Sequence, residues 1–196
     1  MSEKGISKKE IIRKEALELF KEKEYDDVTI MDICNKCGIT KRTFYYHFES
    51  KSELFSTLID MWGVQADEIL ETITTEQKSI DILWQVMRVY CDGAIEYGPD
   101  IVRQIYILNL QGENNTHFPQ GTHLYNFAIS LLKKAQDNEE ILNPNNAEEI
   151  VYILFHALRS ICISWAAEGG TYNLIDEYLK TFYIIVGYPF ALRKTI

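Results

Sequence analysis

The sequence predicts an all-α protein with about nine helices. Its 196 residues include only four Pro and ten Gly, which favours long helices over a turn-rich β fold. Apolar side chains recur at helical spacing, as in Ile12, Ala16, Leu19 and Phe20, which fall at i, i+4, i+7 and i+8. The long apolar runs are too helix-periodic for strands. With 46% hydrophobic residues, the chain is long enough for one core or for a small domain joined to a larger one.

Capping signals mark the first four helices. A hydroxyl residue precedes an acid by three positions at Ser7 and Glu10, Thr29 and Asp32, and Ser50 and Glu53. In such a box the hydroxyl accepts a free backbone N–H and the acid reaches back to the cap. Thr40 begins a further helix, and Gly38 ends the one before it. We therefore expect helices over residues 7–23, 29–38, 40–47 and 50–75.

Five more helices are expected in the rest of the chain. Breaks at Gly98-Pro99, residues 112–121, Asn143-Pro144 and Gly169-Gly170 separate them. The predicted ranges are 78–97, 100–110, 120–138, 145–168 and 172–187.

The charge is divided unevenly along the chain. The formal net charge is −9, but residues 1–54 hold 11 basic and 11 acidic side chains, so the whole excess lies in residues 55–196. The total argues mildly against a nucleic-acid partner. Because DNA responds to the local field, the neutral N-terminal part still permits one.

The four cysteines do not form a disulfide framework, and the charged N-terminus does not resemble a signal peptide, so we expect a cytoplasmic protein. Cys34-x-x-Cys37 places two thiols on one helix face. A structural zinc site needs four ligands, and His47 is the one other candidate nearby. We interpret both cysteines as small core residues, leave a thiol sensor open, and predict neither a metal nor a cofactor.

Two short helices joined by a tight turn at Gly38 are typical of a helix-turn-helix. The first turn of its second helix presents Lys41, Arg42 and Thr43, which are donors at the end that enters a DNA major groove. Arg42 has the geometry for a bidentate pair with guanine, and Thr43 for a contact with a thymine methyl. The alternative for Arg42 is a surface arginine paired with Glu49 or with a phosphate.

Three residues with polar tips follow: Tyr45, Tyr46 and His47, which are suited to phosphate and sugar contacts. The two tyrosines alternatively serve in packing, with their hydroxyls exposed. Lys51, at the start of the next helix, lies within reach of another phosphate. Phe44 and Phe48 are spaced i, i+4 and are expected to face the core.

Residues 38–54, GITKRTFYYHFESKSEL, resemble the N-terminal domain of the TetR family of bacterial regulators. The resemblance covers roughly residues 7–60 and implies a helix-turn-helix DNA-binding domain over 1–54, with a ligand-binding and dimerisation domain over 55–196. It implies phosphate contacts at Thr29, Thr40, Tyr45, His47 and Lys51. It implies base contacts at Lys41, Arg42, Thr43 and Tyr46. Cys34 and Cys37 depart from the alanines usual in the family.

The C-terminal helices favour a homodimer. Residues 150–167 are nearly apolar over the length of a membrane span, but Arg159 sits at the middle, where a charge costs at least ~2.5 kcal/mol in a bilayer. We interpret this segment and the last helix as a buried interface, as the resemblance implies, and expect no membrane span.

Aromatic residues of the middle helices combine apolar bodies with polar handles, which suits a pocket for a lipophilic or aromatic effector, although such stripes are usually core. The resemblance places the effector pocket among these helices. The candidate ligand-binding residues are Trp84, Met87, Tyr90, Tyr106, Tyr125 and His156.

The function expected from this resemblance is that of a repressor, released from a palindromic DNA operator by a small molecule. Alternatives are a helical ligand-binding protein or enzyme whose head is only structural, and a scaffold that uses its acidic C-terminal helices. The sequence contains no Gly-rich phosphate loop, nucleophile elbow or helix-borne zinc motif, so we do not expect an enzyme.

Overall fold

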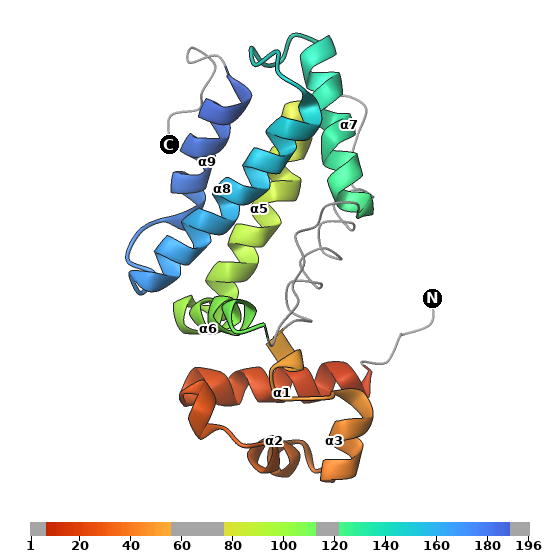
Figure 1. The fold of residues 1–196 in the computed structure, drawn as a ribbon, viewed down its shortest axis with the longest axis vertical. Coiled ribbons are helices and arrows are strands. Elements are labelled where there is room, and N and C mark those ends of the chain that lie inside the picture. The colour runs from red at the N-terminus through yellow and green to blue at the C-terminus, as the bar shows by residue number, and fades with distance from the viewer. Residues whose placement is uncertain (1–6, 56–76, 113–121, 189–196) are drawn as a thin grey trace. The chain divides into compact units, whose positions relative to one another are not determined.

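The computed structural model describes residues 7–55, 77–112 and 122–188 (Figure 1). Within these ranges all regular elements are helices, which confirms the predicted fold class. Of the described residues, 7–55 and 104–112 belong to one compact unit, and 77–103 and 122–188 to another. The expected helix over 50–75 lies largely outside the described residues, so the expected boundary after residue 54 stays a prediction.

The first unit is built on α1 (Lys8–Glu22), α2 (Ile30–Cys37) and α3 (Lys41–His47), with a 3-10 turn, η1 (Tyr25–Asp27), between the first two. The predicted capping boxes at Ser7 and Thr29 are present. The Ser7 hydroxyl accepts the Glu10 N–H, and the Thr29 hydroxyl accepts the Asp32 N–H. Helix α2 packs against both α1 and α3. Fully buried side chains fill the space between them: Ile12, Ala16, Ile33, Phe44 and Phe48.

The turn between α2 and α3 depends on Gly38. Its φ of 61° lies in the left-handed region, which glycine adopts without the steric penalty of a Cβ atom. The Ile39 N–H then bonds back to the Cys34 carbonyl at 2.9 Å. This closes α2 and lets α3 begin two residues later, as the sequence predicts for a helix-turn-helix.

The second unit holds α5 (Ser79–Tyr97), α7 (His123–Asp137), α8 (Ala147–Ala167) and α9 (Leu174–Val186). Helix α6 (Pro99–Leu110) starts in this unit, and its residues from 104 onward belong to the first. Helix α8 packs against α7 and α9, and α5 packs against the same two helices. The predicted ranges for these five helices agree with the structure to within three residues.

Aromatic side chains form much of the second unit's core. The Trp84 ring lies 5.8 Å from that of Tyr178 and 5.4 Å from that of Phe182, measured between centroids. The Phe155 ring lies 5.8 Å from that of Tyr90 and 5.6 Å from that of Tyr125. These aromatic side chains therefore mainly pack α5 and α7 against α8 and α9.

The loop between α7 and α8, residues 138–146, links two distant helix ends. The Glu140 carboxylate accepts the N–H groups of Ser79 and Ile80 at the start of α5. At the other end, the Leu142 N–H donates to the Gly187 carbonyl at 2.9 Å, and the Asn143 side chain donates to the Ile185 carbonyl at 2.6 Å. A Cβ atom on Gly187 would lie 2.8 Å from the Asn143 nitrogen, so the close approach requires glycine.

Helix α8 is long and apolar enough to cross a bilayer, and 44% of its most apolar window is buried inside the protein. The buried residues face α7 and α9, whereas Ile153 and Ile163 remain about half exposed. The apolar composition of α8 therefore reflects both a core face and an uncovered face.

Candidate nucleic-acid interface and ligand-binding residues

Helix α3 presents an outward face of polar and aromatic side chains. The Thr40 hydroxyl caps the helix by accepting the Thr43 N–H at 3.1 Å. Phe44 and Phe48 are 0% and 1% exposed and fix the inner face, as predicted from their spacing. This anchoring directs the predicted DNA-contacting residues of α3 away from the core. Lys41, Arg42, Tyr45 and Tyr46 are exposed, whereas Thr43 and His47 are half-buried.

The surroundings of Arg42, Tyr45 and Tyr46 bear on the alternatives to DNA contact, which are an ion pair for Arg42 and packing for the two tyrosines. Arg42 forms no ion pair with Glu49 or any other acid among the described residues. Tyr46 is 84% exposed, and its ring contacts that of His47 edge-on at 4.9 Å. Tyr45 is 53% exposed and lies edge-on to Phe44. Contacts within the protein therefore cover part of the Tyr45 side chain but little of the Tyr46 side chain.

Thr29 is held by a reciprocal capping box. Its hydroxyl bonds to Asp32, and its backbone N–H donates to the Asp32 carboxylate at 2.8 Å. These bonds stabilise the charged form, so the pKa of Asp32 lies below its ordinary value. Thr29 remains exposed at the start of α2, and its predicted phosphate contact stays a prediction.

Lys51 has a structural role that the sequence did not indicate. Its Nζ donates to the carbonyls of Tyr25 and Val28, at 2.6 Å and 2.8 Å. The same ammonium lies 3.9 Å from the centroid of the Tyr25 ring. Lys51 therefore holds the turn that precedes α2. Its predicted phosphate contact stays a prediction.

Glu53 joins the end of α3 to α1. One carboxylate oxygen accepts the Glu49 N–H, and the other lies 3.4 Å from the Lys9 ammonium. The Ser50 hydroxyl accepts the Glu53 N–H, as the sequence predicts for a cap. The predicted Ser50 cap is therefore present, and the Glu53 carboxylate also bonds to the backbone N–H of Glu49.

The cysteines of α2 are packing residues. Cys34 is 1% exposed, Cys37 is half-buried, and both are free thiols. Burial raises the pKa of each thiol, which keeps it protonated and unreactive. Within the described ranges, no group of three His, Cys, Asp or Glu is placed to hold a metal ion.

The candidate ligand-binding residues do not share one environment. Trp84, Met87 and Tyr90 pack in the core between helices, with Met87 0% exposed. Tyr106 is half-buried on α6. His156 lies on the exposed face of α8, where its ring contacts that of Tyr152 at 4.2 Å. His156 is therefore not a core residue, although it lies mid-helix among apolar neighbours in the sequence.

Tyr125 differs from the other candidates. Its side chain is 1% exposed, and its hydroxyl has no hydrogen-bond partner among the described residues. Burial raises the pKa of this phenol. The residue borders a surface hollow between α7 and the start of α8, with Asn146, Glu148, Glu149, Tyr152 and Ile153. The sequence does not indicate that the two glutamates lie beside Tyr125, because their position depends on the packing of α7 on α8.

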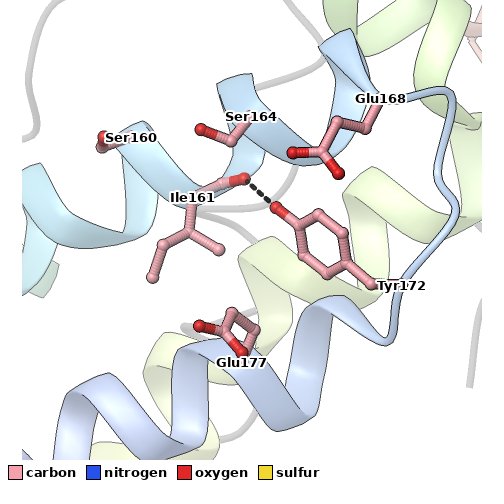
Figure 2. Close-up of a pocket in the computed structure, with 6 residues that line it drawn as sticks. All are labelled: Ser160, Ile161, Ser164, Glu168, Tyr172 and Glu177. Atoms are coloured by element: carbon pink, nitrogen blue, oxygen red, sulfur yellow. Dashed lines mark hydrogen bonds between the residues drawn. The ribbon is translucent and has the colours of Figure 1, made fainter.

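A second hollow lies between α8 and α9 (Figure 2). The Tyr172 hydroxyl donates to the Ile161 carbonyl at 3.1 Å, and Glu168 and Glu177 lie on either side of its ring. Ser160 and Ser164 complete the wall on α8. This hollow is therefore a polar groove beside the outward face of α8, and the Tyr172 hydroxyl within it is already hydrogen-bonded.

Two short helices crossing at a glycine turn, with the second exposing donors and aromatics, define a helix-turn-helix unit of the kind that binds DNA. Residues 12–58 match the family described as bacterial regulatory proteins, tetR family. IcaR of Staphylococcus aureus, a negative transcriptional regulator of a biofilm operon, is 33% identical over 73 residues, which are 37% of this chain and 39% of IcaR.

Solved structures share the fold over nearly the whole chain. The fatty acid degradation regulator FadR from Bacillus halodurans has a TM-score of 0.70 at 17% identity, covering 98% of this chain and 100% of that one. FadR from Thermus thermophilus, solved with lauroyl-CoA, has a TM-score of 0.63 at 18% identity, covering 96% and 97%.

Residues 12–58 of the chain are therefore similar to the DNA-binding domain of TetR-family regulators, and the fold is similar to that of solved regulators. The chain spans less than half the length of the curated relatives that it matches.

Proposed function

We propose that this protein is a cytoplasmic, homodimeric repressor that binds a palindromic operator through α3 and releases it when a small effector binds the second unit. The observation that carries the proposal is the outward face of α3. Buried Phe44 and Phe48 fix that helix, while Arg42 in its first turn and Tyr46 near its C-terminal end remain exposed. A helix held in this way can lie in a major groove without rearranging the core.

The DNA-binding step is tested by a mobility shift on duplex from the region upstream of the gene, over a range of salt concentrations. We expect specific binding that weakens with salt, as ion release requires. Arg42→Ala should relax the preference at one base pair by about 1–3 kcal/mol. Lys133→Ala, on the exposed face of α7 in the other unit, is the control and should bind like the parent. Equal sequence preference in Arg42→Ala and the parent would contradict the base-reading role.

Dimerisation is proposed from the uncovered apolar face of α8 and α9. Ile163 on α8 and Ile184 on α9 are 42% and 69% exposed, beside helices that are otherwise well packed. Paired with their two-fold mates, these helices form a four-helix interface, and the dimer carries two copies of α3. Binding of both copies to successive major grooves requires a separation of ~34–36 Å.

Sedimentation velocity tests this arrangement. Ile163→Lys should convert the dimer to a monomer and reduce operator affinity, because a buried lysine at the interface is unpaired. Ile95→Lys is a matched control, since Ile95 is 45% exposed on α5. A parent protein that sediments as a monomer at micromolar concentration is incompatible with the proposed dimer.

A further inference from the structure

The hollow beside Tyr125 contains an unsatisfied polar group. The Tyr125 hydroxyl is buried and has no hydrogen-bond partner among the described residues, although the side chain borders the hollow. Buried hydroxyls are almost always paired, since leaving one unpaired costs about 1–3 kcal/mol in proteins. By contrast, the buried Tyr178 hydroxyl of the same core donates to the Leu154 carbonyl. The Tyr125 hydroxyl is thus a buried polar group without a partner in the part of the chain that the structure describes.

The start of α8 does not suit an anion as that partner. The Asn146 side chain already accepts the N–H groups of Glu148 and Glu149, at 2.8 Å and 3.3 Å, so these helix amides are satisfied. The carboxylates of the same two residues border the hollow. Among the described residues neither carboxylate forms an ion pair, and no lysine or arginine lines the hollow.

The remaining wall is apolar and aromatic. Tyr152 and Ile153 are 43% and 49% exposed, and both line the hollow next to the glutamates. An aromatic face attracts a cation by its quadrupole, by about 0.5–1 kcal/mol at an exposed site. The hollow thus combines negative charge, a hydroxyl oxygen and an apolar wall.

We infer that this hollow binds an organic ammonium ion with an apolar body. The inference rests on the proposed function, because it names the chemical class of the effector. The ammonium N–H groups donate to the Tyr125 hydroxyl oxygen and to the carboxylates of Glu148 and Glu149. Tyr152 and Ile153 contact the apolar body. The same carboxylates repel a phosphate-bearing ligand, so this site does not suit a molecule such as the lauroyl-CoA bound by the Thermus thermophilus protein.

Calorimetry with a matched pair of probes tests the inference. Octylammonium and octanoate have the same alkyl chain and opposite charge. We expect octylammonium to bind at least about tenfold more tightly than octanoate to the full-length protein. Tyr125→Phe should weaken octylammonium binding about tenfold, as loss of a hydrogen bond to a charged group predicts. The double change Glu148→Gln with Glu149→Gln should weaken it about fivefold, because both carboxylates are exposed.

Glu177→Gln is the control, because Glu177 lines the other hollow, and it should leave octylammonium binding unchanged. Equal binding of the two probes, or unaltered octylammonium binding by either hollow variant, overturns the inference. Thermal unfolding of each variant shows that it is folded. A mobility shift without any probe tests DNA binding separately from the ammonium site. If the protein binds DNA but does not bind octylammonium, the DNA-binding proposal stands and only the ammonium site is contradicted.

Discussion

The Glu140 carboxylate accepts a hydrogen bond from the Ile80 backbone N–H at 2.9 Å, across 60 residues of sequence. Its other oxygen accepts the Ser79 N–H at 3.3 Å, so one loop residue caps α5. The N-cap residue Lys78 makes no side-chain cap bond. We predict that Glu140→Ala lowers the free energy of unfolding by about 1–2 kcal/mol, the range found for lost helix caps. Urea denaturation followed by circular dichroism measures the change.

Glu96→Ala is the control for Glu140, because Glu96 is exposed near the opposite end of α5. It should change the free energy of unfolding by less than about 0.5 kcal/mol, as is usual for surface substitutions. Similar effects for the two variants are inconsistent with a capping role.

Lys51→Met separates a structural from a DNA-contacting role. The methionine retains the apolar stem and loses the bonds to the carbonyls of Tyr25 and Val28. We expect a loss of about 1–3 kcal/mol in the free energy of unfolding, because hydrogen bonds from a charged group are lost at a half-buried position. Lys14→Met, on the exposed face of α1, should be nearly neutral. If Lys51 acts on phosphate alone, both variants will be as stable as the parent.

The Thr29 and Asp32 capping box predicts a dependence of stability on pH. The folded pKa of Asp32 is lowered by its bonds to Thr29, so its contribution is present above the unfolded pKa of about 3.9 and is lost as pH falls through the folded value. Asp32→Asn should therefore lower stability at pH 7 and make the decline on acidification shallower. Urea midpoints measured from pH 6 to pH 3 test this, with Asp26→Asn as control. Parallel curves for Asp32→Asn and the parent rule out the linkage.

Tyr125 and Tyr178, two tyrosines of the second unit that are almost fully buried, form a matched pair. Tyr178 is 0% exposed and its hydroxyl donates to the Leu154 carbonyl at 3.1 Å, whereas the Tyr125 hydroxyl has no partner among the described residues. Tyr178→Phe should lower the free energy of unfolding by about 1 kcal/mol. Without ligand, Tyr125→Phe should be neutral or stabilising, because it removes a desolvated group. Thermal and urea unfolding of the two variants provide the comparison.

The helix boundaries were predictable because they are set locally. A hydroxyl at Thr29 or Thr40 and a glycine at Gly38 act on backbone groups within four residues, so sequence spacing alone reveals them. The outward face of α3 was predictable for the same reason, since Phe44 and Phe48 fix which side is buried.

Contacts between distant segments could not be predicted in this way. Nothing in the spacing around Lys51 indicates that its ammonium meets two carbonyls more than 20 residues earlier. His156 has apolar neighbours in sequence, but its position on α8 turns it to the exposed face. Tyr125 was one of several aromatic candidates, and only the packing of α7 against α8 distinguishes its unpaired hydroxyl.

The loop of residues 138–146 is bonded to the start of α5 by Glu140 and to the end of α9 by Leu142 and Asn143. Neither helix end can fray unless this loop also detaches. Amide protons at both ends should therefore exchange with deuterium at matching rates, as one cooperative opening unit. Glu140→Ala should accelerate exchange at the end of α9, although Glu140 itself bonds to α5.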